Sequence, residues 1–332
     1  MGVKRDRESA GLAEGPSSET ITEDEAALYD RQIRLWGMDC QKRLREAKLL
    51  VIGLNGLGVD YVKNLALSGV KSITLMDETP VSETDSSSQF FAVGHDGEGR
   101  ASASLELIRN LNPNVEVTVD PSPIESLPAS FFAGFTAVFA TAQPVKELVR
   151  ISKACHEHNV KFCCGQTWGF YGYGFFDFQS YKYSRVYKDA KGEQKTDLDL
   201  SCQYNPLEES LNVAAGKGIQ KRICHVYPLF NIVNAFEEQH GRLPSPSSRE
   251  EDLVHLKSLR ATVLQDMGLE DAKKKECTSV FGELSPVCSV LGGIMANEMI
   301  KGISGQGIPI HNFVLFDGEE SWAVTAHIRK KE

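Results

Sequence analysis

The apolar positions of the chain begin only after a polar N-terminal stretch. Residues 1–24 are rich in Gly, Ser, Glu and Asp and carry no periodic apolar positions, so we predict a disordered acidic tail there. From Glu25 to Trp36 apolar residues recur close to helical spacing, and Gly37 offers a C-terminal stop. The ordered part of the chain is therefore expected to begin with a helix near residue 25.

Short apolar runs then alternate with helical segments. A continuous apolar run is typical of a strand that is buried on both faces of a parallel sheet. Regular alternation of such strands with helices predicts a doubly wound, Rossmann-like α/β fold with right-handed crossovers. The expected strands cover 48–53, 71–77, 115–119, 136–140 and 160–164, and the expected helices cover 40–46, 59–68, 100–111 and 145–158.

The pattern changes after Gly165. An aromatic and Gly-rich segment at 169–176 favours antiparallel strands, and an apolar helix with a following strand closes the chain. We expect this last pair to return to the same sheet, which makes 25–332 a single domain with a variable inserted segment at about 180–280. The expected elements are a polar, mobile stretch at 186–200, a Pro/Ser-rich loop at 241–252, a helix at 287–300 and a strand at 312–317.

Charge and cysteine usage exclude several classes of protein. The chain has 332 residues with 36 Lys and Arg against 45 Asp and Glu, a net charge of −9 that disfavours general nucleic-acid binding. No run of 18 apolar residues predicts a membrane span, and the acidic N-terminus lacks the features of a signal or transit peptide. The eight cysteines contain no C-x-x-C pair, so we expect reduced thiols and no zinc site. His156 and His158, two positions apart on a helix, face different sides and predict no metal site either.

A glycine cluster follows the first expected strand. Gly53, Gly56 and Gly58 stand where a strand turns into a helix, and Asp77 ends the next strand. Glycines there allow backbone N–H groups to approach a phosphate, and an acid at the second strand can bind ribose hydroxyls. These residues predict a nucleotide-binding domain, with NAD as the commoner ligand. The alternative is a glycine turn kept for tight helix–strand packing, with no ligand.

Several longer motifs are more specific than this turn. The stretches at 29–37 (Tyr-Asp-Arg-Gln-Ile-Arg-Leu-Trp-Gly), 110–113 (Asn-Leu-Asn-Pro), 284–301 (Leu-Ser-Pro-Val through Lys) and 313–317 (Phe-Val-Leu-Phe-Asp) occur in this order. Together they resemble the ThiF/MoeB-type adenylating domain of ubiquitin-like-modifier activating enzymes, over roughly residues 25–320. Within that family the chain is most similar to the small, Aos-type regulatory subunits that serve the modifier SUMO.

The resemblance implies an activity that this chain keeps only in part. Catalytic halves of the family bind ATP and magnesium, form an acyl-adenylate at the modifier's C-terminus and lead to a thioester. Here Asn55 interrupts the family's glycine pattern, Ser88 stands where the family has a phosphate-binding Arg, and Arg100 replaces a Lys. Ala142 stands where the metal-binding Asp is expected, and no cysteine has the context of a thioester nucleophile. We therefore predict a non-catalytic half with a degenerate pocket at Gly53, Gly56, Gly58 and Asp77.

The resemblance also implies partners. We expect a heterodimer with the larger catalytic SUMO-activating subunit, which binds ATP and magnesium, acts on SUMO and supplies the SUMO-conjugating enzyme. Arg31 matches the family arginine that crosses into the partner's ATP site, a role that suits a planar, permanently charged group. The alternative is that Arg31, beside Asp30 and Arg34, is only part of a charged helix surface. The contact with the partner subunit, or the core that supports it, is expected to include segments 287–301 and 169–178. Within these segments, Val290 and Ile294 are expected in the core. The pathway implies a nuclear protein with some in the cytoplasm.

Other interpretations remain. The glycine turn and Asp77 permit an NAD-dependent dehydrogenase, although no histidine has a matching context for proton transfer, so NAD is not favoured. A subunit for another ubiquitin-like modifier is an alternative, because the choice of modifier rests on the resemblance alone. A self-sufficient homodimeric adenylyltransferase is disfavoured by the changes at 85–89 and 142. The amino-terminal half of a one-chain ubiquitin activator is not expected, since the 332 residues contain no second half. A scaffold without any part in catalysis also stays open.

Overall fold

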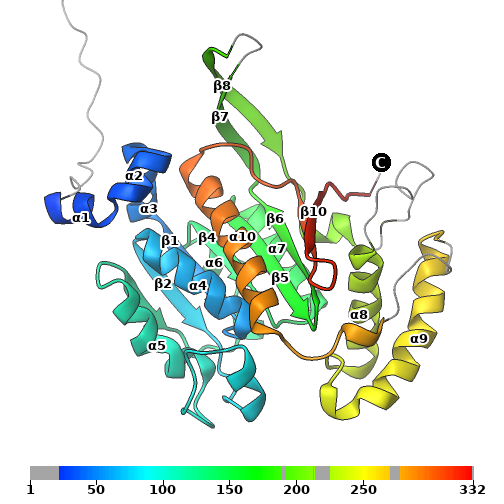
Figure 1. Ribbon diagram of the computed structural model, residues 1–332. Helices are drawn as coiled ribbons and strands as arrows, with labels where there is room; N and C mark the ends of the chain where they lie inside the picture. The colour runs from blue at the N-terminus through cyan, green and yellow to red at the C-terminus, as the bar shows by residue number, and fades with distance from the viewer. Residues whose placement is uncertain (1–21, 189–191, 212, 214–224, 270–276, 331–332) are drawn as a thin grey trace, which may run out of the picture.

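The computed structural model describes residues 22–188, 192–211, 213, 225–269 and 277–330. Residues 1–21 of the predicted acidic tail lie outside this range. Within it, an eight-stranded mixed sheet runs through the centre, and helices cover both of its faces (Figure 1). No helix in the described part of the chain has the length and apolar character needed to cross a membrane.

One half of the sheet is parallel and the other is antiparallel. The strand order is β10-β9-β6-β5-β4-β1-β2-β3, with parallel pairing from β3 to β5 and antiparallel pairing from β5 to β10. The parallel half confirms the doubly wound prediction, and the helix and strand at the end of the chain do return to the same sheet. The strands are β1 (Lys48–Ile52), β2 (Ser72–Met76), β3 (Glu116–Val119), β4 (Ala137–Ala140), β5 (Lys161–Trp168), β6 (Tyr171–Asp177), β9 (Phe313–Asp317) and β10 (Trp322–Ala326).

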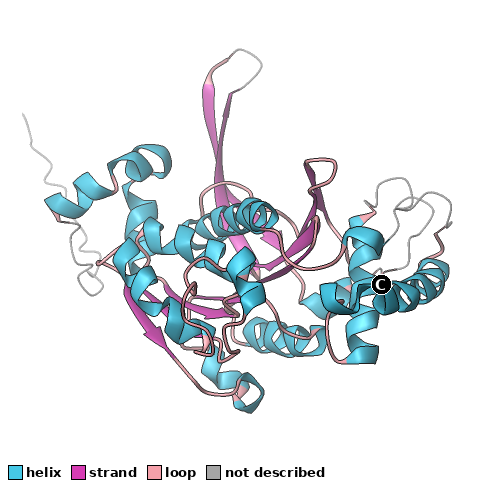
Figure 2. Ribbon diagram, turned by 60° about the horizontal axis from the view of Figure 1, so that its bottom comes forward, coloured by secondary structure: helices cyan, strands magenta, loops and turns pink. Residues whose placement is uncertain are grey.

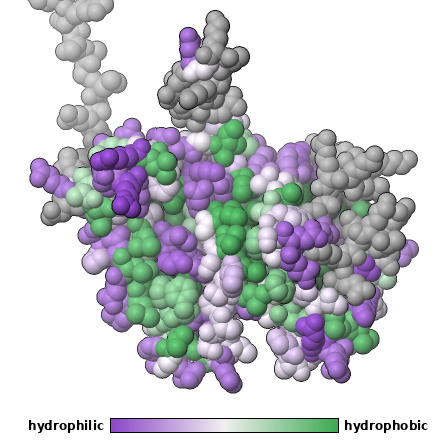
Figure 3. Space-filling view, in the orientation of Figure 1, coloured by the Kyte–Doolittle hydropathy of each residue, from purple (hydrophilic) through white to green (hydrophobic). Residues whose placement is uncertain are grey.

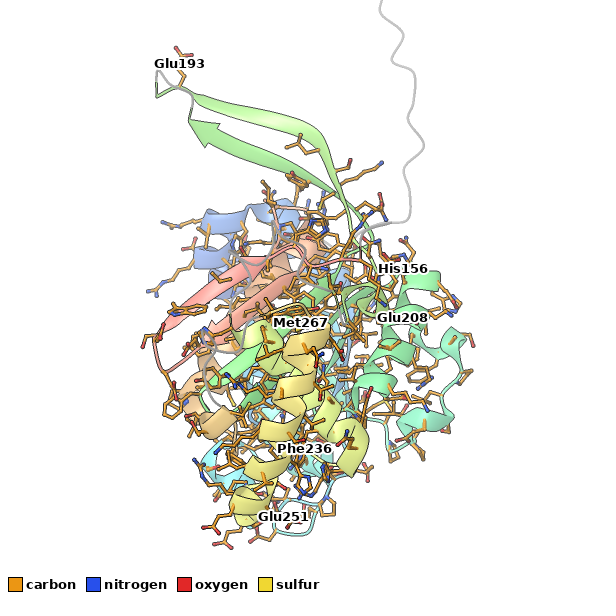
Figure 4. All side chains as sticks on the ribbon, turned by 90° about the vertical axis from the view of Figure 1, so that its right-hand side faces the viewer. His156, Glu193, Glu208, Phe236, Glu251 and Met267 are labelled. Carbon is orange, nitrogen blue, oxygen red and sulfur yellow. The ribbon has the colours of Figure 1, made fainter. Side chains whose placement is uncertain are left out.

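Helices pack on the two faces as two hydrophobic layers (Figure 2). Cys163 and Cys164, adjacent in β5, point into opposite layers, as expected for neighbouring strand residues. Helices α3 (Met38–Glu46), α4 (Gly56–Ser68), α5 (Arg100–Leu111) and α10 (Ser285–Ser304) cover one face. Helices α6 (Ala129–Phe132), α7 (Val145–Glu157), α8 (Val226–His240) and α9 (Arg249–Asp266) belong to the other face. Figure 4 shows α9 from its outer side, and α8, which carries Phe236, packs against it.

The N-terminal helix is divided at Tyr29, where a single helix was predicted. The structure has α1 (Glu23–Leu28) and α2 (Asp30–Trp36), and Thr22 begins α1 with a reciprocal capping box to Glu25. The ring of Tyr29 is 2% exposed, and a Cβ on Gly69 would lie 2.5 Å from it. The chain bends at Tyr29 because this ring is buried against the glycine. Gly37 ends α2 with a φ of +87°, as predicted.

Two segments that were predicted as irregular have regular structure. Of the polar stretch at 186–200, which was expected to be mobile, residues 186–188 and 194–200 belong to a hairpin of β7 (Ser180–Lys188) and β8 (Gln194–Gln203), and 189–191 lie outside the described residues. The hairpin projects from the sheet, with Glu193 near its tip (Figure 4). Its strand signal starts upstream of the polar stretch, where Tyr181 and Tyr183 alternate with polar residues and stack on each other.

The expected loop at 241–252 also proved partly wrong, since α9 begins at Arg249. Asp252, in the first turn of α9, is buried and accepts hydrogen bonds from the Arg242 guanidinium and from the backbone N–H of Ser245. The polar residues of this segment thus stabilise a helix start instead of an open loop.

Candidate degenerate nucleotide site

The glycine turn lies at the carboxyl end of β1, beside the ends of β2 and β4. Gly53 has a φ of +90°, and a Cβ there would lie 2.2 Å from the carbonyl oxygen of Thr141. A Cβ on Gly58 would lie 2.1 Å from the carbonyl oxygen of Gly53. Both contacts are far below a van der Waals distance, so the turn needs glycine for the approach of the chain to itself. The packing interpretation therefore accounts for these two glycines without any ligand.

Asp77 lies beside the turn as predicted, but its carboxylate is already engaged. One oxygen accepts from the backbone N–H of Leu54 at 2.7 Å, and the other accepts from that of Thr79 at 3.0 Å. Arg100 approaches Asp77 to 3.8 Å. With both oxygens bonded inside the chain, Asp77 holds the turn in place, which does not favour the ribose-binding role of an NAD-dependent enzyme.

Asn55 begins helix α4. Its backbone is extended, and its Oδ1 accepts a hydrogen bond from the backbone N–H of Gly58 at 3.1 Å, which makes it an N-cap. This contact fixes the orientation of the amide, so the Nδ2 group faces the pocket. It donates to Glu283 Oε1 at 2.6 Å. The side chain that interrupts the family's glycine pattern thus connects the helix start to a distant acid.

Glu283 is the residue of this pocket that sequence reasoning missed. Its Oε1 accepts from Asn55 and, at 3.1 Å, from the Thr167 hydroxyl; its Oε2 accepts from the Gly56 backbone N–H and the Ser88 hydroxyl, both at 3.1 Å. Burial raises the pKa of the Glu283 carboxyl above its ordinary range, and these donors act in the opposite direction. Four converging donors are what a carboxylate requires.

Arg100 is present but neutralised. Its Nη2 lies 2.7 Å from the Asp85 carboxylate, which also accepts from Ser82 at the start of a short 3₁₀ helix over Glu83–Ser87. The Arg100 charge is therefore paired within the stretch where catalytic halves of the family carry phosphate-binding residues. Ser88, at the position where the resemblance implies a phosphate-binding Arg, follows the 3₁₀ helix, and its hydroxyl donates to Glu283 Oε2.

No carboxylate follows β4. Ala142, with a φ of +53°, and Gln143 occupy the position where the family resemblance implies a metal ligand. Among the described residues, no group of three His, Cys, Asp or Glu side chains is arranged to hold a metal ion. Burial also raises the pKa of the Cys164 and Cys288 thiols, so neither is a thiolate nucleophile at neutral pH.

A cavity of about 590 Å³ opens beside these groups. The buried Arg100 Nε, Gln166 Oε1 and Trp168 Nε1 have no hydrogen-bond partner among the described residues. The residues present do not fit ATP with magnesium, because Glu283 takes the donors at the start of α4 and the metal ligand is missing. The cavity is lined by Asn55, Thr84, Asp85, Ser87, Arg100, Ala142, 166–168, 243–246 and 280–283.

Arg31 lies on α2, away from this pocket. It is exposed and forms no ion pair within the described residues, whereas Arg34, one turn further, pairs with Asp30 at 3.0 Å. The helix itself is fixed through Tyr29, whose hydroxyl accepts a hydrogen bond from Asn112 Nδ2 at 2.8 Å. That same amide group donates to the backbone of α4. The motifs at 29–37 and 110–113 thus meet in space and hold Arg31 outward on an anchored helix.

An apolar face follows α10, which lies beside α4 at the front of the molecule (Figures 1 and 3). Depressions of about 420 Å³ and 290 Å³ lie along this helix. We call the surface around them the α10 face; its exposed apolar residues are Leu67, Phe170 and Val290, at 45%, 42% and 46% exposure. The core position predicted for Val290 is wrong, because it lies on the outer side of α10, whereas Ile294 does pack against the core.

Comparison with known proteins agrees with this architecture. A protein-family model described as the ThiF family matches residues 29–332. The chain is 38% identical to SUMO-activating enzyme subunit 1 of Xenopus laevis over 91% of this chain and 95% of that protein. It is 38% identical to the Homo sapiens protein of the same name, over 90% and 93%, and 39% identical to that of Danio rerio, over 94% and 97%.

Solved structures show the same fold at low identity. The crystal structure of E. coli MccB with succinimide aligns with a TM-score of 0.55 and 12% identity, over 92% of this chain and 72% of that chain. The complex of E. coli MccB with MccA-N7isoASN aligns with a TM-score of 0.57 over the same shares. At this identity the likeness supports the fold alone.

Proposed function

The chain belongs to the ThiF family, and from this premise we propose that it is the non-catalytic adenylating half of a heterodimeric SUMO-activating enzyme. Its partner is the larger catalytic subunit, which binds ATP and magnesium. The single observation that carries the proposal is the glycine turn, whose phosphate donors are taken by Glu283. A chain of this fold without a usable phosphate site acts through another chain.

Arg31 is the residue through which this chain contributes to the reaction. When bound in the partner, ATP adenylates the C-terminal carboxylate of SUMO and pyrophosphate leaves. The exposed Arg31 guanidinium reaches the β- and γ-phosphates and stabilises the charge that develops as pyrophosphate separates. A planar, permanently charged group that bridges two oxygens suits this task. The anchoring of Tyr29 keeps α2 positioned for it.

The α10 face provides the contact with the larger subunit. Its exposed Phe170 and Val290 come from the two segments, 169–178 and 287–301, that were expected at the interface. Every residue of β6 is buried, so this strand supports the contact from within the core, and only Phe170, just before β6, contributes directly. Contiguous exposed apolar residues bordered by polar ones are typical of a protein–protein contact.

Further parts of the proposal follow from the resemblance. SUMO is bound mainly by the partner, and the thioester formed there passes to the SUMO-conjugating enzyme. The protein is nuclear, with some in the cytoplasm. A subunit for a different ubiquitin-like modifier is the remaining alternative, since the partner carries most of the modifier recognition.

ATP–pyrophosphate exchange tests the proposed function. The purified chain alone should give no exchange with any ubiquitin-like modifier, and addition of the larger subunit with SUMO should make exchange dependent on both chains. Exchange by the isolated chain contradicts the non-catalytic role. Exchange with another modifier but not with SUMO replaces SUMO by that modifier and leaves the rest of the proposal intact.

A further inference from the structure

We propose that Glu283 is the residue that closes the glycine turn of this chain to nucleotide phosphates, because its carboxylate occupies the anion-binding position at the start of α4. The inference rests on the proposed function and deepens it. Missing phosphate and metal ligands explain a weak site, whereas an internal carboxylate at the turn explains a site that rejects anions.

The position taken by the carboxylate is that of a bound anion. Helix α4 has 13 residues, and the partial positive charge of its first turn favours an anion there. The Gly56 backbone N–H, which points out of this turn, donates to Glu283 Oε2 at 3.1 Å. The hydroxyls of Ser88 and Thr167 and the amide of Asn55 complete the donors around the carboxylate. An entering phosphate would have to replace the carboxylate at all four.

The backbone around Glu283 is fixed, so the side chain is held in the pocket. Residues 279–283 pair with the turn between β5 and β6: Gly169 N–H donates to the Gly282 carbonyl at 2.7 Å, and Phe170 N–H to the Ser279 carbonyl at 3.1 Å. A Cβ on Gly169 would lie 2.1 Å from the Ser279 carbonyl oxygen, which shows how closely the two segments approach. Helix α10 begins two residues after Glu283.

The charges around the pocket also disfavour the binding of a phosphate. The described residues that line the cavity include two carboxylates, Glu283 and Asp85, and one cationic group, the Arg100 guanidinium, so the wall carries more negative than positive charge. A phosphate at the turn would meet like charge at short distance, which disfavours its binding. Removal of the Glu283 carboxylate releases its four donors and leaves the Arg100 charge less compensated. The turn should then accept an anion, although no catalysis is expected.

Inorganic pyrophosphate, without metal ion, tests this with the full chain. Binding is measured by isothermal titration calorimetry, and the Gly56 amide resonance in ¹⁵N-labelled protein reports the location. The parent should show no saturable binding at millimolar pyrophosphate and no shift of Gly56. Glu283→Ala should bind pyrophosphate saturably, about 10- to 100-fold more tightly than the limit that the parent sets, and should shift the Gly56 resonance, because a like charge is removed and its donors are released.

Glu283→Gln removes the charge but keeps the size of the side chain, so its affinity for pyrophosphate should rise less than that of Glu283→Ala. Glu298→Ala is the matched control: Glu298 is a buried carboxylate in α10 that accepts from the Ile310 backbone N–H at 2.6 Å, away from the turn. Its loss should not create pyrophosphate binding.

Two results overturn the proposal. One is saturable binding by the parent with a shift of Gly56; the other is no gain in the folded Glu283 variants. If Glu283→Ala does not fold, Glu283→Gln decides alone, by the presence or absence of a Gly56 shift with pyrophosphate. The measurement needs no partner subunit, so its failure is distinguishable from failure of the exchange experiment.

Discussion

The glycine turn and helix α2 differ in where their polar groups find partners. At the turn, the groups that could bind a nucleotide are bonded within the chain: Asp77 to backbone N–H groups and Arg100 to Asp85. On α2, the Arg31 guanidinium points outward and forms no ion pair with any described residue. The comparison shows that the polar groups at the turn are used for bonding within the chain, whereas the Arg31 guanidinium on the outer surface is left for a ligand or a partner.

The largest expected effect concerns Arg31. In the heterodimer, Arg31→Ala should slow adenylation by about 10²- to 10³-fold, because a preorganised cationic donor to the phosphates is lost. Arg31→Lys should recover only part of the rate, since an ammonium cannot reproduce the bidentate fork. The measurement is single-turnover adenylate formation at saturating ATP.

Arg34→Ala is the matched control, because Arg34 pairs with Asp30 on the same helix and should have a smaller effect. Heterodimer assembly and transfer from a preformed thioester should stay largely unchanged in Arg31→Ala. Equal adenylation rates for Arg31→Ala and the parent would remove the crossing role and leave the chain a scaffold.

A charge on the α10 face should have the next largest effect. Val290→Glu places a carboxylate in the proposed apolar contact and should weaken binding of the larger subunit by about 10- to 100-fold, measured by surface plasmon resonance. Val254→Glu on α9 is the control, since Val254 is 68% exposed and lies outside the α10 face. Equal affinities of the two variants would place the contact elsewhere.

The anchoring of α2 should give the smallest effect. Asn112→Ala removes the donor to the Tyr29 hydroxyl and to the Ala66 carbonyl, both at 2.8 Å and buried. The free energy of unfolding should fall by about 1–3 kcal/mol in urea denaturation, because buried acceptors lose their partner. Adenylation by the heterodimer should fall by less than in Arg31→Ala. An unchanged adenylation rate despite the stability loss would show that Arg31 does not depend on this anchor.

The parallel half of the fold could be predicted from the sequence, and the projecting hairpin could not. Strands such as β1 and β4 are buried on both faces, so they appear as continuous apolar runs that a short window detects. The stretch at 186–200 is polar, and its pairing depends on a partner strand. The bend at Tyr29 depends on Gly69, forty residues away in the sequence, which no local pattern reveals.

The same limit applies to the site. Gly53, Gly58 and Asp77 were predicted correctly as neighbours, because the carboxyl ends of parallel strands meet at one edge of the sheet. Glu283 stands 228 residues from Asn55, and an acid before a helix gives no sign of the turn it contacts. The sequence could suggest changes at Ser88 and Ala142 through the family resemblance, whereas the hydrogen bonds of Glu283 to the turn could be seen only in the structure.

The contact between Ser88 and Glu283 has a consequence for how such a chain could change over time. An arginine acquired at position 88 would stand where the Ser88 hydroxyl now meets the Glu283 carboxylate at 3.1 Å, and would form an ion pair with that carboxylate in preference to a phosphate. Loss of Glu283 alone would leave four donors without their acceptor and a fold of lower stability. Neither of these single substitutions would give a catalytic site, because position 142 would still lack a metal-binding side chain. If the chain is the non-catalytic half proposed above, a change to a catalytic half would therefore need substitutions at several positions together, and no single one of them would be selected for.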